Sequence, residues 1–362
     1  MGFSKNLHKH LAAFGIAALC FGYFASYIPF SMLTKMLTRG MLPGMNGVGV
    51  SGFEIQPVAA LGTCIGMYLF ITLSKWWKFA THSKILGVSV PRPQWFTFIS
   101  GICTSGIIVT TVLAYTFQGI SIVFAMLLMR GGVLIMAPVI DMIVKRRKRK
   151  IYWPSWIASA LSFGALIIAF SGKAGTAITF IAGADICLYL FSYFFRLYFM
   201  SNRAKGDSTD ERKRYFVEEQ MVANPAMLIL LFIIGWFGSA SDPVGVAGGF
   251  WQGFVSFPFK GYFLITLLIG LLSYSVGLFG TLIFLDKREN TFTVPANRSS
   301  SIMAGVVATY LLYMFFGGKA PATDELVGAG MIIVAIVFLA YRSTMDKRKA
   351  ALKMANKSKP GL

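Results

Sequence analysis

Long uncharged apolar runs alternate with short basic segments along this chain of 362 residues. Residues 11–33 carry no charged side chain, and neither do residues 93–129, which are long enough for most of two helices. Runs of about 18 or more such residues are typical of transmembrane helices. The pattern therefore predicts an all-α integral membrane protein with ten spans: 11–33, 54–74, 95–117, 119–144, 152–171, 175–200, 219–240, 261–285, 292–316 and 325–342.

The basic residues predict how these spans are oriented. If both termini are cytoplasmic, the inside loops receive most of the lysines and arginines, including the six consecutive basic residues of 145–150. The outside loops then receive only Lys35, Arg39, Lys173, Lys260 and Lys319. Such an excess marks the cytoplasmic side, where basic loops meet anionic lipid headgroups. The net charge of +20 is therefore explained without a nucleic-acid partner.

Two sequence echoes indicate that the chain consists of two related halves. Residues 297–305 (NRSSSIMAG) resemble residues 129–137 (MRGGVLIMA), and residues 218–225 resemble residues 53–60 in the matching order. Five spans in each half would give the halves opposite directions through the membrane, a common plan of transporters with a mid-membrane substrate site. We predict a first five-helix repeat, a second five-helix repeat and a basic cytoplasmic tail, at residues 1–172, 173–342 and 343–362.

The sharpest candidates for substrate binding are two arginines within apolar segments, Arg130 and Arg298. An arginine in hydrocarbon is costly and usually faces a cavity lined by protein, where its planar donors suit a phosphate or a carboxylate. Alternatively, each arginine pairs with an acid as a structural lock, or extends to the membrane interface.

Acidic residues near the spans give candidates for coupling or for counter-ions. Asp185 lies mid-span, as a counter-ion to an arginine or as a proton carrier. Glu54 and Glu219 stand at span entrances, where the helix dipole, a gate or the substrate could require them. Arg196 is expected to extend to the inner interface, and Asp141 to neutralise the basic run that follows it.

Polar uncharged side chains complete the predicted substrate site. Gln220 and Asn224 are one helical turn apart, and Asn297 and Ser299 flank Arg298. The serines that follow Arg298 suit either the wall of a polar cavity or close helix packing.

These motifs resemble the drug/metabolite transporter superfamily, especially its EamA-type and nucleotide-sugar transporter branches. Glu219-Gln220 followed by Asn224-Pro225 is similar to the seventh-span entrance of such proteins, where an asparagine contributes to the substrate site. Ala296-Asn297-Arg298 is similar to the ninth-span Ala-Leu-Asn-Lys pattern of nucleotide-sugar transporters, with arginine in place of lysine. The resemblance implies a secondary transporter that moves a small polar, anionic or zwitterionic metabolite by alternating access, through exchange or proton coupling.

Two other functions stay open at this point. A proton-coupled exporter of amino acids or drugs would rely on Asp185 and Glu54 more than on the arginines. A membrane-embedded transferase would need clustered carboxylates or histidines, and the outside loops show none, so we expect no enzyme, no cofactor and no metal site. A homodimer is left open. The absence of an Asn-x-Ser/Thr site from the outside loops favours a bacterial inner membrane over an organelle membrane.

Overall fold

The computed structural model describes residues 15–85, 87–113, 122–144, 153–170, 180–205 and 208–317, with shorter stretches between 323 and 345. The long helices in this part are α2 (Ile16–Thr38), α3 (Gly52–Leu73), α4 (Trp95–Leu113), α5 (Ile122–Ile143), α6 (Trp153–Phe170), α7 (Phe180–Phe199), α8 (Thr209–Gly238), α9 (Val246–Val255), α10 (Phe263–Phe284) and α11 (Asn290–Phe316). Shorter elements are η1 (Trp76–Phe79), β1 (His82–Ile85), β2 (Val88–Pro91), η3 (Met200–Ala204) and η4 (Phe257–Phe259).

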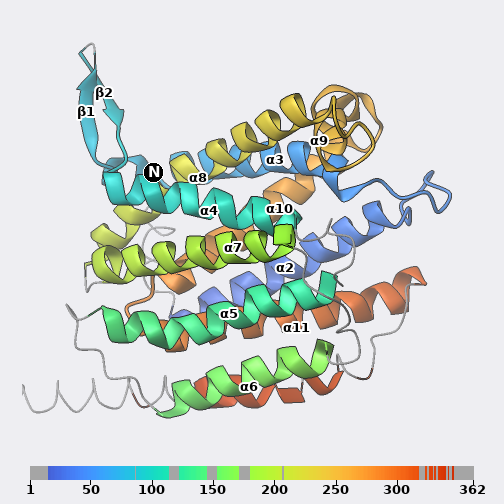
Figure 1. Ribbon diagram of the computed structural model, residues 1–362. Coiled ribbons are helices and arrows are strands. Elements are labelled where there is room, and N and C mark those ends of the chain that lie inside the picture. Colours follow the sequence, from blue (N-terminus) through green and yellow to red (C-terminus); the bar gives the residue numbers. More distant parts are fainter. Residues whose placement is uncertain are drawn as a thin grey trace, which may run out of the picture.

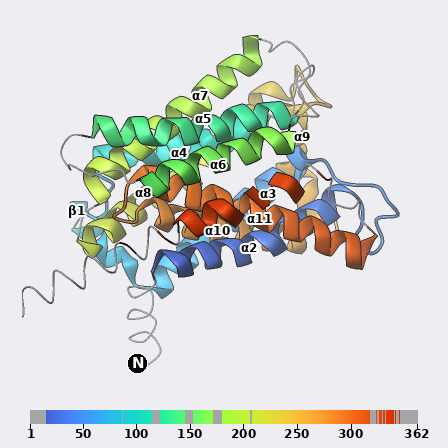
Figure 2. The ribbon, with the colours of Figure 1, turned by 90° about the horizontal axis from the view of Figure 1, so that it is seen from below.

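Apart from the short α9, these helices lie side by side along a common direction, with α3 and α8 at one side of the bundle and α6 at the other (Figure 1). The view from below shows the same alignment (Figure 2). Among the described residues, α2, α3, α8, α10 and α11 are long and apolar enough to cross a membrane. Their outer faces expose large apolar side chains, such as Leu73 at 71% and Leu264 at 76%. The prediction of a mostly helical protein with apolar helices of membrane-spanning length is confirmed.

Helix boundaries depart from the prediction where polar residues continue a helix or where a loop was expected. Helix α8 begins ten residues before the predicted span, because Ser208 caps it by accepting a hydrogen bond from the Glu211 backbone N–H (3.3 Å). Helix α9 occupies a segment predicted as an outside loop. The predicted tenth span, 325–342, is described with gaps, and its described part belongs to a shorter apolar helix, Leu326–Leu339.

The helices pack in a limited set of pairs. Helix α3 packs on α8, α9 and α10, and α4 packs on α7 and α8. Helix α2 packs on α10 and α11, whereas α5 packs on α6, α7 and α11. The main buried cluster lies between α3, α5, α7, α8 and α10, with Met67, Ile140, Leu197 and Phe216 among its fully enclosed side chains.

Small residues bring two of these pairs into backbone contact. At the α3–α10 crossing, a Cβ on Gly62 would lie 2.5 Å from the Leu267 carbonyl oxygen, and the Thr63 hydroxyl donates to the Gly270 carbonyl (3.1 Å). At the α4–α8 crossing, a Cβ on Gly101 would lie 3.0 Å from the Glu219 carbonyl oxygen. Glycine in this role lets helix backbones approach closely in lipid.

The N-terminus of α11 is capped by a side chain from α5. The backbone N–H groups of Asn290 and Thr291 donate to the Asp141 carboxylate (2.9 and 2.7 Å), and the Thr291 hydroxyl donates to it as well (2.8 Å). Glu289, the residue at the N-cap position, makes no side-chain cap and instead accepts from the Ser155 hydroxyl of α6 (3.0 Å). Asp141 therefore caps α11. Its expected role beside the basic run of 145–150 is not tested, because that run lies outside the described residues.

A two-stranded antiparallel hairpin, β1–β2, interrupts the otherwise helical pattern between α3 and α4. Its base is held by Glu218 of α8, whose side chain is fully buried. This carboxylate accepts hydrogen bonds from the Thr81 N–H (3.0 Å) and hydroxyl (2.8 Å), the Gln94 N–H (3.0 Å) and the Thr97 hydroxyl (2.7 Å). Four donors satisfy the buried charge and fix the hairpin to the first turn of α4.

Candidate functional site

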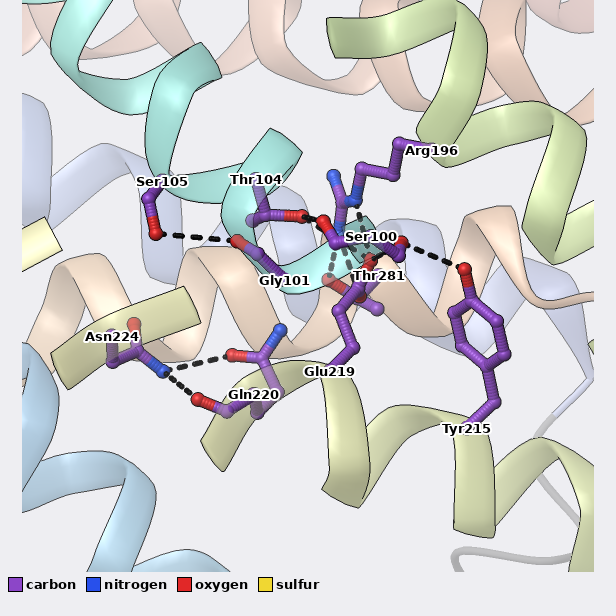
Figure 3. Close-up of polar contacts among 10 residues, drawn as sticks. All are labelled: Ser100, Gly101, Thr104, Ser105, Arg196, Tyr215, Glu219, Gln220, Asn224 and Thr281. Carbon is purple, nitrogen blue, oxygen red and sulfur yellow. Dashed lines mark hydrogen bonds and ion pairs between the residues drawn. The ribbon is translucent and has the colours of Figure 1, made fainter. Parts of the chain in front are cut away.

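Arg196 of α7 and Glu219 of α8 form a buried ion pair at the centre of a polar cluster (Figure 3). The Arg196 Nε donates to Glu219 Oε1 (2.9 Å), and one terminal nitrogen donates to Oε2 (3.1 Å). The same terminal nitrogen also donates to the Thr281 hydroxyl of α10 (3.0 Å), so the pair connects three helices. Arg196 is only 5% exposed, so the expectation that it extends to the membrane interface was wrong.

Hydroxyl groups from α4 complete the environment of the Glu219 carboxylate. Ser100 and Thr104 donate to Oε1 at 2.7 and 3.2 Å, and the Tyr215 hydroxyl in turn donates to Ser100 (2.7 Å). A buried carboxylate is tolerated only when its charge is paired and its lone pairs are engaged, and both conditions hold here. Glu219 lies ten residues into α8, so its partners, and not the helix N-terminus, determine its environment.

Arg298 is a second buried cation, in the body of α11. Its position eight residues after Asn290 puts it about 12 Å from the start of that helix. A terminal nitrogen lies 3.4 Å from the Tyr189 hydroxyl, and the guanidinium carbon lies 5.3 Å from the centre of the Tyr193 ring. The Arg298 Nε has no hydrogen-bond partner, and no ion pair to Arg298 occurs among the described residues.

Two tyrosines of α7 form the wall opposite this guanidinium. The rings of Tyr189 and Tyr193 have centroids 4.9 Å apart, and both side chains are buried. A ring face attracts the cation, and a tyrosine hydroxyl accepts a hydrogen bond from it. Arg298 is therefore oriented by neutral groups that do not cancel its charge.

Asp185 lies on the same helix as these tyrosines and is only 7% exposed. Its Oδ2 is buried and has no hydrogen-bond partner among the described residues. In α10, the buried Tyr274 hydroxyl also lacks a partner within this described part of the chain. Buried polar atoms are rarely left in this way, so each is a candidate to hold a proton, a water molecule or a ligand.

The polar uncharged candidates are all buried, but they divide between two helices. On α8, the Asn224 amide donates to the Gln220 carbonyl (3.2 Å) and to its side-chain oxygen (3.1 Å), directly beside the ion pair (Figure 3). On α11, the Ser299 hydroxyl lies 3.3 Å from that of Ser162, and the Asn297 amide nitrogen lies beside Gly280 of α10.

The remaining predicted residues lie apart from this cluster or outside the described side chains. Glu54 lies in the first turn of α3, where Lys260 donates to its carboxylate. This pair is half-exposed on the lysine side, and its segment lies near α9, at the end of the bundle opposite the hairpin (Figure 1). Arg130 belongs to α5, but its side chain lies outside the described part.

Sequence reasoning missed a third buried cation, Lys205, at the end of η3. Its ammonium group donates to the Asn290 side-chain oxygen (2.6 Å), the Thr293 hydroxyl (3.1 Å) and the Arg288 carbonyl (3.2 Å). Lys205 is 1% exposed although it follows an apolar helix in the manner of an ordinary loop lysine. Two of the three acceptors belong to the polar first turns of α11, and this polar sequence was the available signal.

The side chains of the site offer hydrogen-bond donors, acceptors and ring faces. The described residues hold no group of three or more His, Cys, Asp or Glu side chains that could bind a metal ion. They do hold an arginine oriented by tyrosines, a separate neutralised arginine–glutamate pair and several amide and hydroxyl groups. Such a set can bind an anionic or zwitterionic group through planar donors and contact its apolar part with ring faces.

Comparison with known proteins gives a structural likeness for the fold and no information on the site. The sequence matches no protein-family model and no curated protein. One solved crystal structure of a protein aligns over 92% of this chain and 98% of its own chain, with a TM-score of 0.55 and 12% sequence identity. At this identity the likeness shows a shared fold alone, one that spans nearly the full length of both chains.

Proposed function

We propose that this protein is a secondary transporter, not an enzyme, that moves a small anionic or zwitterionic organic metabolite across a membrane by alternating access. The observation that carries the proposal is Arg298, a buried cation held by tyrosines and without an acidic partner among the described residues. A permanent charge in such a place is costly, and a ligand of opposite charge would offset that cost.

Support for alternating access comes from the symmetry of the helix pairs. In the proposed inverted repeat, α2 to α5 correspond to α7, α8, α10 and α11. The pairs α3–α10, α2–α10 and α2–α11 then have the counterparts α8–α4, α7–α4 and α7–α5, and all six occur. The pairs α3–α8 and α5–α11 are their own counterparts, and both occur. Two halves that interlock in this way can rock about a shared site.

Side-chain details favour the same correspondence. Thr63 donates across the α3–α10 crossing, and Ser105 donates to the Ala223 carbonyl (2.6 Å) across the corresponding α4–α8 crossing. Glu54 of α3 binds Lys260 just before α10, and Glu218 of α8 binds Gln94 just before α4. Under the proposed symmetry these contacts secure opposite ends of the bundle, which is what the two gates of a carrier require.

In the proposed orientation, the hairpin, Asp141 and Lys205 lie at the cytoplasmic end, with both chain termini on that side. The loops at this end carry most of the basic residues, which favours the cytoplasmic face. We place the protein in a bacterial inner membrane, and Arg130 in the counterpart position of Arg298 on α5.

The transport proposal is tested with purified protein in two steps. Thermal shift against nucleotides, nucleotide sugars, amino acids and amphipathic cations identifies a ligand, and counterflow of that ligand in proteoliposomes establishes a carrier. We expect Arg298→Gln to abolish both stabilisation and counterflow, while the matched control Arg203→Gln, at an exposed arginine on Phe96, leaves both intact. If Arg298→Gln binds and exchanges the ligand normally, the arginine is structural and the proposal fails.

A proton-coupled exporter of amino acids or drugs is a second candidate, favoured by the unpartnered Oδ2 of buried Asp185. In that case substrate movement would change the pH inside the vesicles, which an enclosed dye reports. Asp185→Asn would abolish the coupled pH change, whereas exchange of substrate for substrate would continue. Counterflow without any proton movement would exclude this candidate and leave an exchanger.

A further inference from the structure

The β1–β2 hairpin has two chemically different faces. Residues paired across an antiparallel ladder share a face, and successive residues alternate between faces. One face therefore carries the pairs His82–Pro91 and Lys84–Ser89, and the other carries Ser83–Val90 and Ile85–Val88. Val88 is 64% exposed and Val90 37% exposed, so apolar surface on the second face is uncovered.

The hairpin runs crosswise to the helices, at the end of the bundle where α4 begins and α7 ends (Figure 1). The view from below keeps β1 at that same end (Figure 2). A strand pair that extended along the helix direction would project into water. One that lies across the helix ends extends sideways, past the edge of the bundle and at the level of the lipid headgroups.

The segment around the hairpin has the composition of a membrane interface. Residues 75–95 include Lys75, Lys78, Lys84 and Arg92 and contain no acidic residue. The Lys78 ammonium lies 5.0 Å from the centre of the Phe79 ring, and the Lys213 ammonium of α8 lies 4.6 Å from the centre of the same ring. Basic residues together with accessible tryptophans, here the partly buried Trp77 and the exposed Trp95, are typical of the layer where anionic headgroups meet acyl chains.

We propose that the hairpin is a lipid-binding element, which places Val88 and Val90 against the acyl boundary and directs Lys84 and Arg92 towards the phosphates of anionic lipids. The Glu218 carboxylate holds the base of the hairpin through four hydrogen bonds, so its direction is fixed before lipid binds. Pairing with a second copy is disfavoured, because each strand has only four residues and the edges carry Lys84 and Pro91. The inference needs only that the helices span a membrane and is independent of transport.

Depth measurement by spin labels tests the proposal directly in the full chain. Cys20, Cys64, Cys103 and Cys187 are replaced by alanine, and a nitroxide is attached at Val88→Cys or, on the opposite face, at Ser89→Cys. Both proteins are reconstituted in phosphatidylcholine vesicles with and without phosphatidylglycerol. We expect the Val88→Cys label to be shielded from a water-soluble nickel chelate and accessible to oxygen in the anionic vesicles, and the Ser89→Cys label to stay accessible to nickel.

The charge requirement has its own variants. Lys84→Gln and Arg92→Gln should each weaken insertion of the labelled hairpin about fivefold, because a cation near an anionic membrane surface contributes a factor of that size. Equal nickel access at Val88→Cys and Ser89→Cys in anionic vesicles would overturn the proposal. Spin–spin broadening that persists on dilution with lipid would overturn it too, since the face would then contact a second copy.

A measurement on the chain with its native cysteines covers the case in which the alanine substitutions prevent folding. Backbone hydrogen exchange of β1 and β2 is compared in nanodiscs of phosphatidylcholine and of phosphatidylglycerol. We expect slower exchange in the anionic nanodiscs, and slower exchange than in an Arg92→Glu variant in those same nanodiscs. Identical rates in the two lipids would refute the inference.

Discussion

Removing one partner of the Arg196–Glu219 pair should destabilise the protein far more than removing both. Glu219 is fully buried and accepts from Arg196 twice, from Ser100 and from Thr104. In the Glu219→Gln variant, the Arg196 charge stays buried with the Thr281 hydroxyl and one amide oxygen as acceptors but without a counter-charge. An uncompensated buried charge of this kind costs about 3–5 kcal/mol.

A double-mutant cycle separates this cost from the value of the pair itself. In the Arg196→Met/Glu219→Gln variant no charge remains, and the glutamine oxygen can still accept from Ser100 and Thr104. Replacing a buried ion pair by neutral side chains is often close to neutral in stability, so we expect the double variant to be more stable than either single variant, with a coupling free energy at least as large as one single cost, about 3–5 kcal/mol.

The measurement is unfolding by denaturant in mixed micelles, with free energies taken from the linear dependence on denaturant concentration. Lys260→Met at the half-exposed Glu54–Lys260 pair is the matched control, and it should cost at most about 1 kcal/mol. The reasoning is refuted if Glu219→Gln is no more costly than this control, or if the double variant is as unstable as the sum of the single variants.

Three further predictions concern the helix contacts. Gly62→Val should prevent folding or strongly reduce the yield of folded protein in detergent, because its Cβ would lie 2.5 Å from the Leu267 carbonyl, whereas Gly305→Val, where nothing lies within 4 Å, should be tolerated. Asp141→Ala should lower the free energy of unfolding by about 1–2 kcal/mol through loss of the α11 cap, and Asp141→Asn by less. Glu218→Gln should accelerate hydrogen exchange at the Thr81 and Gln94 amides without affecting α11, and unchanged rates there would contradict the anchoring role.

The sequence carried information on the helices but little on which side chains contact each other between helices. Apolar runs located the long helices because the hydrophobicity of a segment is a property of that segment alone. The partner of Arg196 could not be found in this way, because Glu219 lies on the next helix and the pair forms only when α7 and α8 pack with α4 and α10. The same limit explains Asp141, whose neighbours in sequence are basic but whose bonded partners lie 149 and 150 residues later.

The hairpin and α9 were missed for a different reason. Both are short and lie in segments that the hydropathy pattern marks only as connections. Four-residue strands joined by Leu86 and Gly87 have too few alternating positions to distinguish a hairpin from a loop. The glycine at position 87 was the local sign of a tight turn in the sequence, and its φ of 81° in the structure agrees with that role.

The cap that Asp141 provides has a mechanical consequence for the two helices that carry Arg130 and Arg298. The carboxylate fastens the last turn of α5 to the first turn of α11, so these helices are held together at this end. We expect α5 and α11 to move apart by pivoting at this contact, with the largest displacement at their opposite ends. If the protein is the proposed carrier, its substrate would enter between α5 and α11 while the two helices stay in contact at the Asp141 end.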